Sequence, residues 1–382
     1  MKIGILTFHK AINYGSVLQT WSTQTLLEKA GYEVEVIDYE PRVWSSLYGT
    51  FRKGRSLSAL KQNIKILPIA YFSWKRTKGF ECFRKNKLHL SEEKYMISSD
   101  FSKLAQKYDC IVCGSDQIWN IDIQDCDPIY FLPNIPVKKK IAYAVSVGNS
   151  DLTNERANEE LKTQISDFNS ITVREERTIE RINHFVGAEK VKACTLDPTL
   201  LHNKEEFYSI CAPRRVKEDY IFLYNIWNVN EGFQIAKEVS NRKKLPVYTI
   251  MTVKSLHILY RIYKNDIRIV MTKTAPEDYL SYFRYASFTI TDSFHGTAFS
   301  IIFEKPFLCV NYTKPDGSYK NDIRLRNVLG YYDLTDRYVT AAQVKEYNLD
   351  LVPDYTVVTK KRMEQAEKSI DLLLSEIDEG GN

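Results

Sequence analysis

The chain has 382 residues and a formal net charge of +5, and its composition is 44% hydrophobic and 26% charged. This length exceeds the ~250 to 300 residues over which a single core usually grows, so two domains of ordinary size are expected. The charge is too small and too dispersed to indicate nucleic acid binding, and no run of ~18 apolar residues predicts a membrane-spanning helix.

The seven cysteines are scattered singly, apart from Cys110 and Cys113 within one expected strand. This pattern predicts neither a disulfide framework nor a four-ligand zinc site. The amino terminus enters a strand pattern directly and lacks the features of a signal peptide. Together these features favour a cytoplasmic protein.

The first half of the chain alternates strands with helices. Residues 2–8 have the pattern of a buried strand, 16–30 that of a helix, and 33–38 that of a second strand. Further strands are expected at about 109–113, 141–147, 171–174 and 191–196, with helices at about 153–168 and 175–186. Because strands that alternate with helices form parallel sheets, we predict an α/β domain over residues 1–212.

Residues 42–108 depart from this alternation because they are basic and aromatic. One interpretation is a helical insertion with solvated cationic faces. The other is a surface for a phosphate-bearing or membrane-held substrate, which would bring the protein into peripheral contact with anionic lipid. The residues concerned are Arg52, Lys53, Arg55, Lys61, Lys65, Trp74, Lys75, Arg76, Lys78, Arg84, Lys85 and Lys87.

A second alternation follows a linker-like segment at 211–215. Strands are expected at 220–224, 247–251, 268–271, 288–291 and 307–310, with helices at about 231–241 and 276–286. This pattern predicts a second α/β domain over residues 213–355. A final helix, within the segment 356–382, is expected to dock on one of the domains. Two doubly wound domains of this kind imply a cleft between them.

The most informative segment places a histidine where a buried strand passes into a helix. Asp292 and Ser293 follow the strand as capping residues, and Gly296 allows a tight turn or a close approach to a ligand. In a parallel sheet this loop lies at the carboxyl edge, where its N–H groups face a bound anion. His295 is therefore a candidate active-site residue. A histidine held by a neighbouring carbonyl or carboxylate is the alternative.

Three other loops follow predicted strands. The first contains His9, Asn13, Tyr14, Gly15 and Ser16 and lacks the dinucleotide-binding glycine pattern, so it indicates either substrate contact or simple capping.

In the second of these loops, Asp116 is a candidate for orienting or deprotonating a sugar hydroxyl, and Trp119 for stacking on a pyranose. A turn closed by Ser115 and Asp116 is the alternative. In the third, Arg174 ends a strand, where its guanidinium suits a carboxylate or phosphate, unless it forms a structural ion pair with Glu175 or another acid.

Four segments together resemble the polysaccharide pyruvyl transferase family. They are Asn13-Tyr14-Gly15, the Gly-Ser-Asp-Gln-Ile-Trp loop at 114–119, Val173-Arg174-Glu175, and Thr291 to Gly296. The resemblance extends from residue 3 to about residue 330. Where other members carry Arg-Leu-His or a similar triplet, this chain has Ser293-Phe294-His295. The missing cation must therefore be supplied by Arg174, Lys314 or Arg324.

The resemblance implies two Rossmann-like domains facing across a cleft, similar to the glycosyltransferase B architecture. The implied activity transfers the pyruvate moiety of phosphoenolpyruvate onto two hydroxyls of one sugar, forming a cyclic ketal in cell-surface polysaccharide biosynthesis. The acceptor is usually lipid-linked or polymeric. Phosphoenolpyruvate is a co-substrate, and the scheme requires no metal or other cofactor.

The residue chemistry is compatible with this activity. His295 would protonate the methylene carbon, and Asp116, with His9 behind it, would take the hydroxyl proton. The expected donor-binding residues are Arg174, Ser293, Gly296, Thr297, Lys314 and Arg324. The expected acceptor-binding residues are His9, Asn13, Tyr14, Gly15, Ser16, Ser115 and Trp119.

Two other functions fit the same pattern. A nucleotide-sugar glycosyltransferase would have the same architecture, and a non-catalytic protein that binds a glycan or an anion would keep the cleft without turnover. The donor distinguishes these hypotheses, because only the first requires phosphoenolpyruvate.

Overall fold

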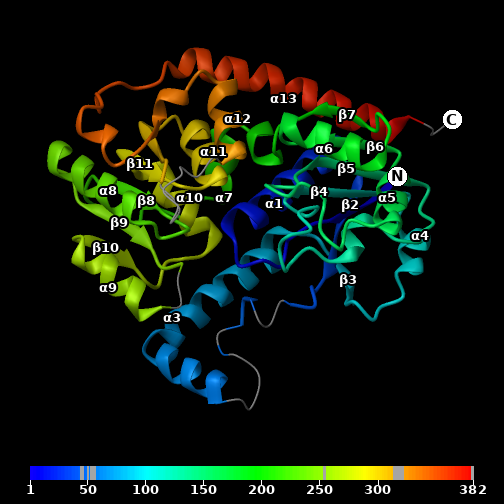
Figure 1. The fold of residues 1–382 in the computed structure, drawn as a ribbon, viewed down its shortest axis with the longest axis horizontal. Helices are drawn as coiled ribbons and strands as arrows, with labels where there is room; N and C mark the ends of the chain where they lie inside the picture. Colours follow the sequence, from blue (N-terminus) through cyan, green and yellow to red (C-terminus); the bar gives the residue numbers. More distant parts are fainter. Residues whose placement is uncertain (44–46, 50, 52–56, 253–254, 313–321, 380–382) are drawn as a thin grey trace. The chain divides into compact units, whose positions relative to one another are not determined.

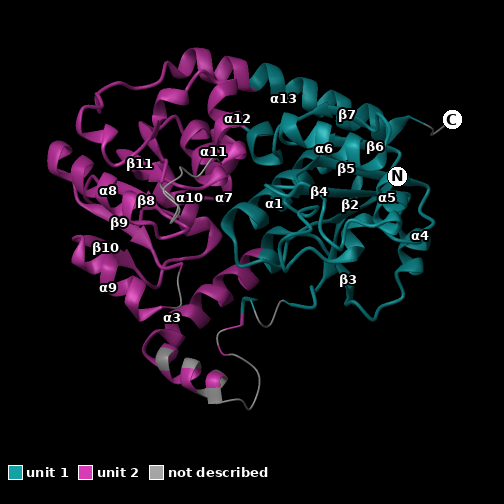
Figure 2. Cartoon of the chain, in the orientation of Figure 1, with its two compact units in different colours: residues 1–48, 84–202, 363–382 teal, residues 49–83, 203–362 magenta. Residues whose placement is uncertain are grey.

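The computed structural model describes residues 1–43, 47–49, 51, 57–252, 255–312 and 322–379. The chain forms two compact units (Figure 2). Unit 1 comprises residues 1–48, 84–202 and 363–382, and unit 2 comprises residues 49–83 and 203–362.

The sheet of unit 1 has seven parallel strands in the order β3-β2-β1-β4-β5-β6-β7 (Figure 1). The order reverses direction between β1 and β4, which makes this pair the topological switch point of a doubly wound fold. The strands are β1 Lys2–Leu6, β2 Glu33–Tyr39, β3 Leu90–Tyr95, β4 Cys110–Asp116, β5 Lys139–Val145, β6 Ser170–Val173 and β7 Val191–Cys194.

Helix α1 lies beside this switch point. Asn13 caps its first turn by accepting a hydrogen bond from the Gly15 N–H, and Gly31, with φ of 92°, follows its end. Its residues are buried almost all round, so α1 is a core helix and not an amphipathic surface helix. The helices of this part are α1 Tyr14–Lys29, α4 Leu104–Lys107, α5 Glu159–Ser166 and α6 Glu176–Val186.

The sheet of unit 2 is also parallel, with the order β10-β9-β8-β11-β12-β13. Its switch point lies between β8 and β11. The strands are β8 Ile221–Tyr224, β9 Val247–Ile250, β10 Ile267–Val270, β11 Phe288–Thr291, β12 Phe307–Val310 and β13 Tyr338–Val339. The helices are α7 Lys204–Ile210, α8 Asn230–Lys243, α9 Leu256–Lys264, α10 Pro276–Tyr285, α11 Phe294–Ile302 and α12 Ile323–Tyr331.

Two long helices contribute residues to both units. In α3 Leu57–Lys87 the division falls between residues 83 and 84, and in α13 Tyr355–Asp378 it falls between 362 and 363. The final helix is therefore not confined to one unit. The linker-like segment at 211–215 lies inside unit 2, and α7 precedes it.

The basic segment at 42–108 is not a purely helical insertion. It contains α3, but it also supplies the edge strand β3, which pairs with β2. The sequence of β3, Leu-Ser-Glu-Glu-Lys-Tyr, is polar because three of its six residues are exposed. Edge strands commonly carry such charged side chains, so hydrophobic periodicity did not reveal this one.

Candidate functional site

In unit 1, Asp116 links β4, one strand of the switch-point pair, to helix α1. It ends β4, and its Oδ2 accepts a hydrogen bond of 2.6 Å from the Ser16 hydroxyl in the first turn of α1. Its Oδ1 accepts a bond of 2.9 Å from the Gln117 N–H. The first two loops therefore lie close together, and these two bonds fix the orientation of the Asp116 carboxylate.

Arg174 is buried within a cluster of carboxylates. Its Nε lies 2.9 Å from Glu175 Oε1, and its Nη1 lies 2.9 Å from Asp197 Oδ2 and 3.8 Å from Asp116 Oδ1. Burial lowers the pKa of Arg174, but Glu175, Asp197 and Asp116 together raise it above its ordinary value. One cation thus faces three acids, which leaves no positive charge in excess for an anionic donor. These contacts favour the structural ion pair over donor binding.

Ser115 belongs to the interior of unit 1. Its hydroxyl donates to the Ala144 carbonyl over 2.6 Å, and its N–H donates to Gln19 Oε1 over 3.0 Å. The side chain is fully buried, so direct contact between this hydroxyl and a sugar is excluded in this conformation. This burial argues against the expectation that Ser115 binds the acceptor.

The first loop also has a structural role. His9 is fully buried, with Nδ1 3.2 Å from the Thr7 carbonyl and Nε2 3.1 Å from Asp38 Oδ1. Desolvation lowers the pKa of His9 despite this carboxylate, and the pKa of Asp38 falls to about 2: burial raises it, but the contacts with His9 and Lys10 lower it more. This geometry does not suit His9 as the reserve base.

The remaining residues of this loop have mainly structural roles. Asn13 caps α1, as the capping alternative predicted, while Tyr14, Gly15 and Ser16 are buried in its first turn. The Ser16 hydroxyl donates to Asp116. None of these contacts tests the expectation that this loop binds the acceptor.

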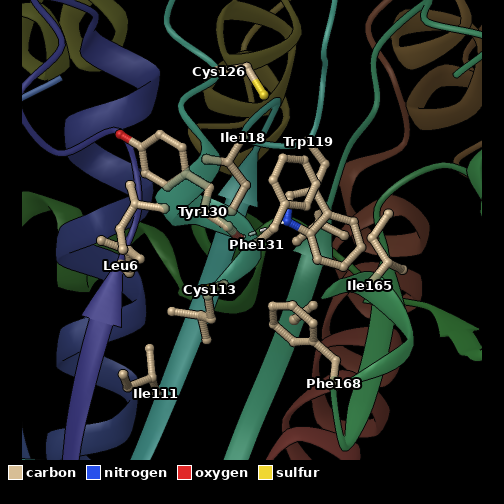
Figure 3. Packing of buried hydrophobic residues seen from close by; sticks show 14 of the residues in the cluster. Leu6, Ile111, Cys113, Ile118, Trp119, Cys126, Tyr130, Phe131, Ile165 and Phe168 are labelled. Atoms are coloured by element: carbon tan, nitrogen blue, oxygen red, sulfur yellow. Dashed lines mark hydrogen bonds between the residues drawn. The ribbon is translucent and has the colours of Figure 1, made fainter. Parts of the chain in front are cut away.

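Trp119 lies in the hydrophobic core of unit 1 (Figure 3). Its indole N–H donates to the Tyr130 carbonyl over 3.0 Å. Its ring stacks on Phe131 at 5.5 Å between centroids and meets Phe168 edge-on at 5.2 Å. The side chain has no exposed area, so no ring face is left for a pyranose. This burial argues against the expectation that Trp119 stacks on the acceptor.

In unit 2, hydrogen bonds link the loop after β11 to the loop after β8, at the second switch point. Asp292 accepts hydrogen bonds from the backbone N–H groups of Ile226 and Trp227, at 2.7 and 2.9 Å. Those amides belong to the loop between β8 and α8. Asp292 thus links the loops after β8 and β11 in unit 2. Asp116 similarly links the end of β4 to α1 in unit 1.

His295 lies in the first turn of α11. Ser293 is the N-cap of this helix, and its hydroxyl accepts from the Gly296 N–H at 3.4 Å. The His295 ring packs edge-on against Phe294, with 5.2 Å between centroids, and the residue is 7% exposed. The sequence correctly predicted the order of strand, cap, histidine and helix. The partial positive charge of a helix N-terminus is concentrated at this turn.

Gly296 and Thr297 serve the packing of α11. A β-carbon added to Gly296 would lie 2.8 Å from Thr291 Cβ, and closer still to Thr291 Oγ1. The Thr297 hydroxyl is buried, donates to the Ser293 carbonyl at 3.0 Å and contacts Cys309 Sγ. Gly296 therefore permits a close approach of helix and strand, and the Thr297 hydroxyl makes its contacts inside unit 2.

Gly296→Ala is expected to destabilise unit 2 by about 1–3 kcal/mol, because the new methyl group overlaps Thr291 on β11. Gly330→Ala in α12 is the matched control, since its nearest neighbour would be Thr335 at 4.0 Å. The control should be neutral or slightly stabilising, because alanine favours a helix. Urea unfolding of both variants measures the difference. Equal midpoints would show that α11 can shift to accept the methyl group.

The expected cations of unit 2 have different environments. Arg324 forms a two-pronged ion pair with Asp322, at 3.0 Å through Nε and 2.7 Å through Nη2. Lys314 lies outside the described residues. Arg326 lines a cavity of about 420 Å³ with Asn311, Leu329, Thr335 and Tyr338. Arg326 lies on α12, two residues after Arg324, and the cavity places it near the end of β12, because Asn311 also lines it.

Sequence patterns did not identify three of the residues that build these sites. Asp197 caps the short helix at Pro198–Leu201 and also binds Arg174, and Gln19 anchors the Ser115 N–H. Trp227 is 57% exposed beside the Asp292 loop. The topological rule points to the loop after β8, because that strand borders the switch point in unit 2.

All seven cysteines lie in the described part of the chain, and none forms a disulfide. Among the described residues, no group of three or more histidine, cysteine, aspartate or glutamate side chains is arranged to hold a metal ion. Within the same residues, no helix is both long and apolar enough to cross a bilayer.

Comparison with known proteins agrees with the resemblance and with the fold. A sequence profile for polysaccharide pyruvyl transferase matches residues 13–314. No curated protein sequence matches the chain.

Several solved structures are similar. A UDP-GlcNAc 2-epimerase from Methanocaldococcus jannaschii has 11% identity and a TM-score of 0.54, over 98% of this chain and 99% of that one. A putative UDP-N-acetylglucosamine 2-epimerase from Listeria monocytogenes has 11% identity and a TM-score of 0.54, over 99% and 95%. MnaA of S. aureus in a co-structure with UDP has 10% identity and a TM-score of 0.51, over 99% and 96%. At these identities the similarity shows the fold alone. It confirms the expected pair of doubly wound domains, similar to the glycosyltransferase B architecture.

Proposed function

Because the chain belongs to the polysaccharide pyruvyl transferase family, we propose that it transfers the pyruvate moiety of phosphoenolpyruvate onto two hydroxyls of one glycan sugar. The observation that carries this proposal is the position of His295. It lies in the first turn of α11, directly after the strand that borders the switch point of unit 2. Open α/β sheets bind their ligands at such positions.

The chemistry of unit 2 suits an anionic donor. Phosphoenolpyruvate carries a carboxylate and a phosphate, and both are favoured by the N-terminal end of a helix. Ser293 holds the entry to α11 in place, and Asp292 fixes the neighbouring loop through Ile226 and Trp227. We assign the donor to this turn, with Lys314 and Arg326 as the cations that compensate its charge.

The proposed reaction begins with a proton transfer. His295 donates a proton to the methylene carbon, which becomes a methyl group, and the adjacent carbon acquires oxocarbenium character. The first sugar hydroxyl attacks that carbon and gives its proton to a base. The carbon–oxygen bond to phosphate then breaks, inorganic phosphate leaves, and the second hydroxyl closes the ketal and releases its proton. Histidine suits the first step because it titrates nearer to neutral pH than other side chains.

Asp116 is the base that we propose for the acceptor hydroxyl. Ser16 and Gln117 hold its carboxylate at the switch point of unit 1. The Nη1 of Arg174 lies 3.8 Å from Asp116 Oδ1. Because Glu175 and Asp197 already bind its guanidinium group, Arg174 is a positioning residue in the scheme. The β1–α1 loop, from His9 to Ser16, would border the acceptor.

We place the reaction in the cytoplasm, with a lipid-linked or polymeric glycan as acceptor and with no metal or further cofactor. The absence of disulfides among the seven cysteines supports a reducing compartment.

The donor can be identified by thermal unfolding. Phosphoenolpyruvate at about 100 times its Kd should add about 2.7 kcal/mol of stability, which raises the Tm by roughly 5–11 °C for a unit of this size. UDP and GDP, at matched concentration and ionic strength, are the controls, and His295→Gln should still bind. Stabilisation by a nucleoside diphosphate and not by phosphoenolpyruvate would support a nucleotide-sugar glycosyltransferase instead. Binding of phosphoenolpyruvate without phosphate release, in the presence of accepted glycans, would indicate a non-catalytic protein.

A further inference from the structure

Helix α3 exposes a continuous apolar and aromatic stripe. Four large side chains on it are about half exposed: Ile64 (56%), Leu67 (59%), Tyr71 (57%) and Trp74 (50%). Their spacing of three, four and three residues places them on one side of the helix. We call these four residues the outer face of α3. Large apolar side chains that adjoin on a surface are unusual in a protein without a partner there.

The opposite side of α3 already supplies the packing that the helix needs. Ile69, Ser73, Phe80 and Phe83 are buried, and their spacing of four, seven and three residues forms a second stripe. Arg76, between them, lies over the Phe80 ring and donates to the Thr252 carbonyl. Packing within the fold therefore accounts for the buried side of the helix and leaves the outer face unexplained.

The charges of α3 are almost all positive. The sequence of α3 contains a single acid, Glu81, which pairs with Lys78, against eight basic residues. The Nζ of Lys75 lies 5.8 Å from the centroid of the Tyr71 ring, and Lys61 and Lys78 are exposed. The basic residues are Lys61, Lys65, Lys75, Arg76, Lys78, Arg84, Lys85 and Lys87.

We propose that the outer face of α3 docks on an anionic membrane surface. The aliphatic residues Ile64 and Leu67 would enter the boundary of the acyl chains, and Tyr71 and Trp74 would lie at the level of the headgroups. The flanking lysines would contact lipid phosphates, each gaining from the negative surface potential. The sequence alone predicted an electrostatic contact. The exposed stripe adds an apolar contribution, so binding should depend on both kinds of side chain.

Charge decides between a bilayer and a second copy of this chain. Two copies that met through this face would bring their lysines together, and like charges at an interface oppose association. An anionic membrane offers phosphate groups to the lysines and an acyl-chain boundary to the apolar stripe. The inference does not depend on the proposed reaction, because it concerns a surface and not the donor or acceptor.

Vesicle sedimentation of the full chain tests the inference. Vesicles of phosphatidylglycerol and phosphatidylcholine should retain the protein at low salt, and vesicles of phosphatidylcholine alone should retain much less. Leu67→Gln with Trp74→Gln should weaken binding about tenfold or more, because burying the exposed half of each side chain contributes a factor of roughly three to ten. Lys61→Gln with Lys75→Gln and Lys78→Gln should weaken binding and flatten its salt dependence.

Val357→Gln with Met363→Gln is the matched control, because both residues are exposed on another long helix, α13. This variant should bind like the wild type. Circular dichroism and thermal unfolding establish that each variant remains folded. The inference is overturned if the wild type stays in the supernatant at low salt, or if the Leu67 and Trp74 variant binds as well as the control. A concentration-dependent dimer in sedimentation equilibrium, abolished by the same two substitutions, would also overturn it in favour of a second copy.

Discussion

His295→Gln is expected to reduce turnover by about 10² to 10⁴, the usual loss when a general acid is removed. Glutamine has a similar size and forms hydrogen bonds, but it has no proton to donate at neutral pH. It is preferable to alanine because His295 is buried in the first turn of α11, and a smaller side chain would leave a cavity there. Phosphate release from phosphoenolpyruvate in the presence of an accepted glycan measures the effect.

His257→Gln is the control for this variant, since His257 is an exposed histidine on α9 of the same unit. It should leave turnover unchanged. The His295 variant should keep the Tm of the wild type within a few degrees and should still be stabilised by phosphoenolpyruvate. Turnover within threefold of the wild type would remove His295 from the reaction, whatever its position in the fold.

Arg174→Met is expected to lower the free energy of unfolding by about 3–5 kcal/mol, the usual effect of removing one partner of a buried ion pair. Methionine roughly fills the space of the arginine stem, so the loss is mainly electrostatic. Glu175, Asp197 and Asp116 would remain buried without the cation that faces them. Urea unfolding followed by circular dichroism measures the shift.

Arg177→Met on α6 controls for the loss of an arginine near the same turn. Arg177 is more than half exposed and lies 4.0 Å from Asp151, so its removal should cost less than about 1 kcal/mol. Arg174→Lys supplies a second comparison, because a lysine keeps the charge and loses the fork. If Arg174 is structural, this variant keeps its affinity for phosphoenolpyruvate. A stable Arg174→Lys protein with weakened donor binding would restore Arg174 to the donor site.

The sequence predicted the elements whose residues are strongly apolar. The strands at 288–291 and 307–310 have the expected bounds, because all their residues are buried and flanked by turn residues. Sequence patterns did not predict the edge strands β3 and β13. The first is polar, and the second is only two residues long.

The candidate site was only partly predictable, because burial depends on partners far along the chain. Trp119 follows a strand end, where an exposed aromatic would suit a sugar, but Phe131 and Phe168 cover its ring. The sequence left two interpretations of Arg174 open, and the structure shows that Asp197 binds its guanidinium group. Asp292 was expected to cap α11, but it binds backbone amides 65 and 66 residues earlier in the sequence. Local pattern indicates a capping residue and cannot reveal such a distant partner.

The central claim is that this chain makes a pyruvate ketal from phosphoenolpyruvate, and product mass tests it most directly. The wild-type protein and His295→Gln are incubated with phosphoenolpyruvate and a panel of lipid-linked galactosides, glucosides and mannosides. The account predicts that at least one glycan gains the mass of pyruvate less one water, with one phosphate released per product, and that the variant makes little of it. Transfer of a sugar from a nucleotide donor by the wild type, with no gain of pyruvate on any glycan, would contradict it.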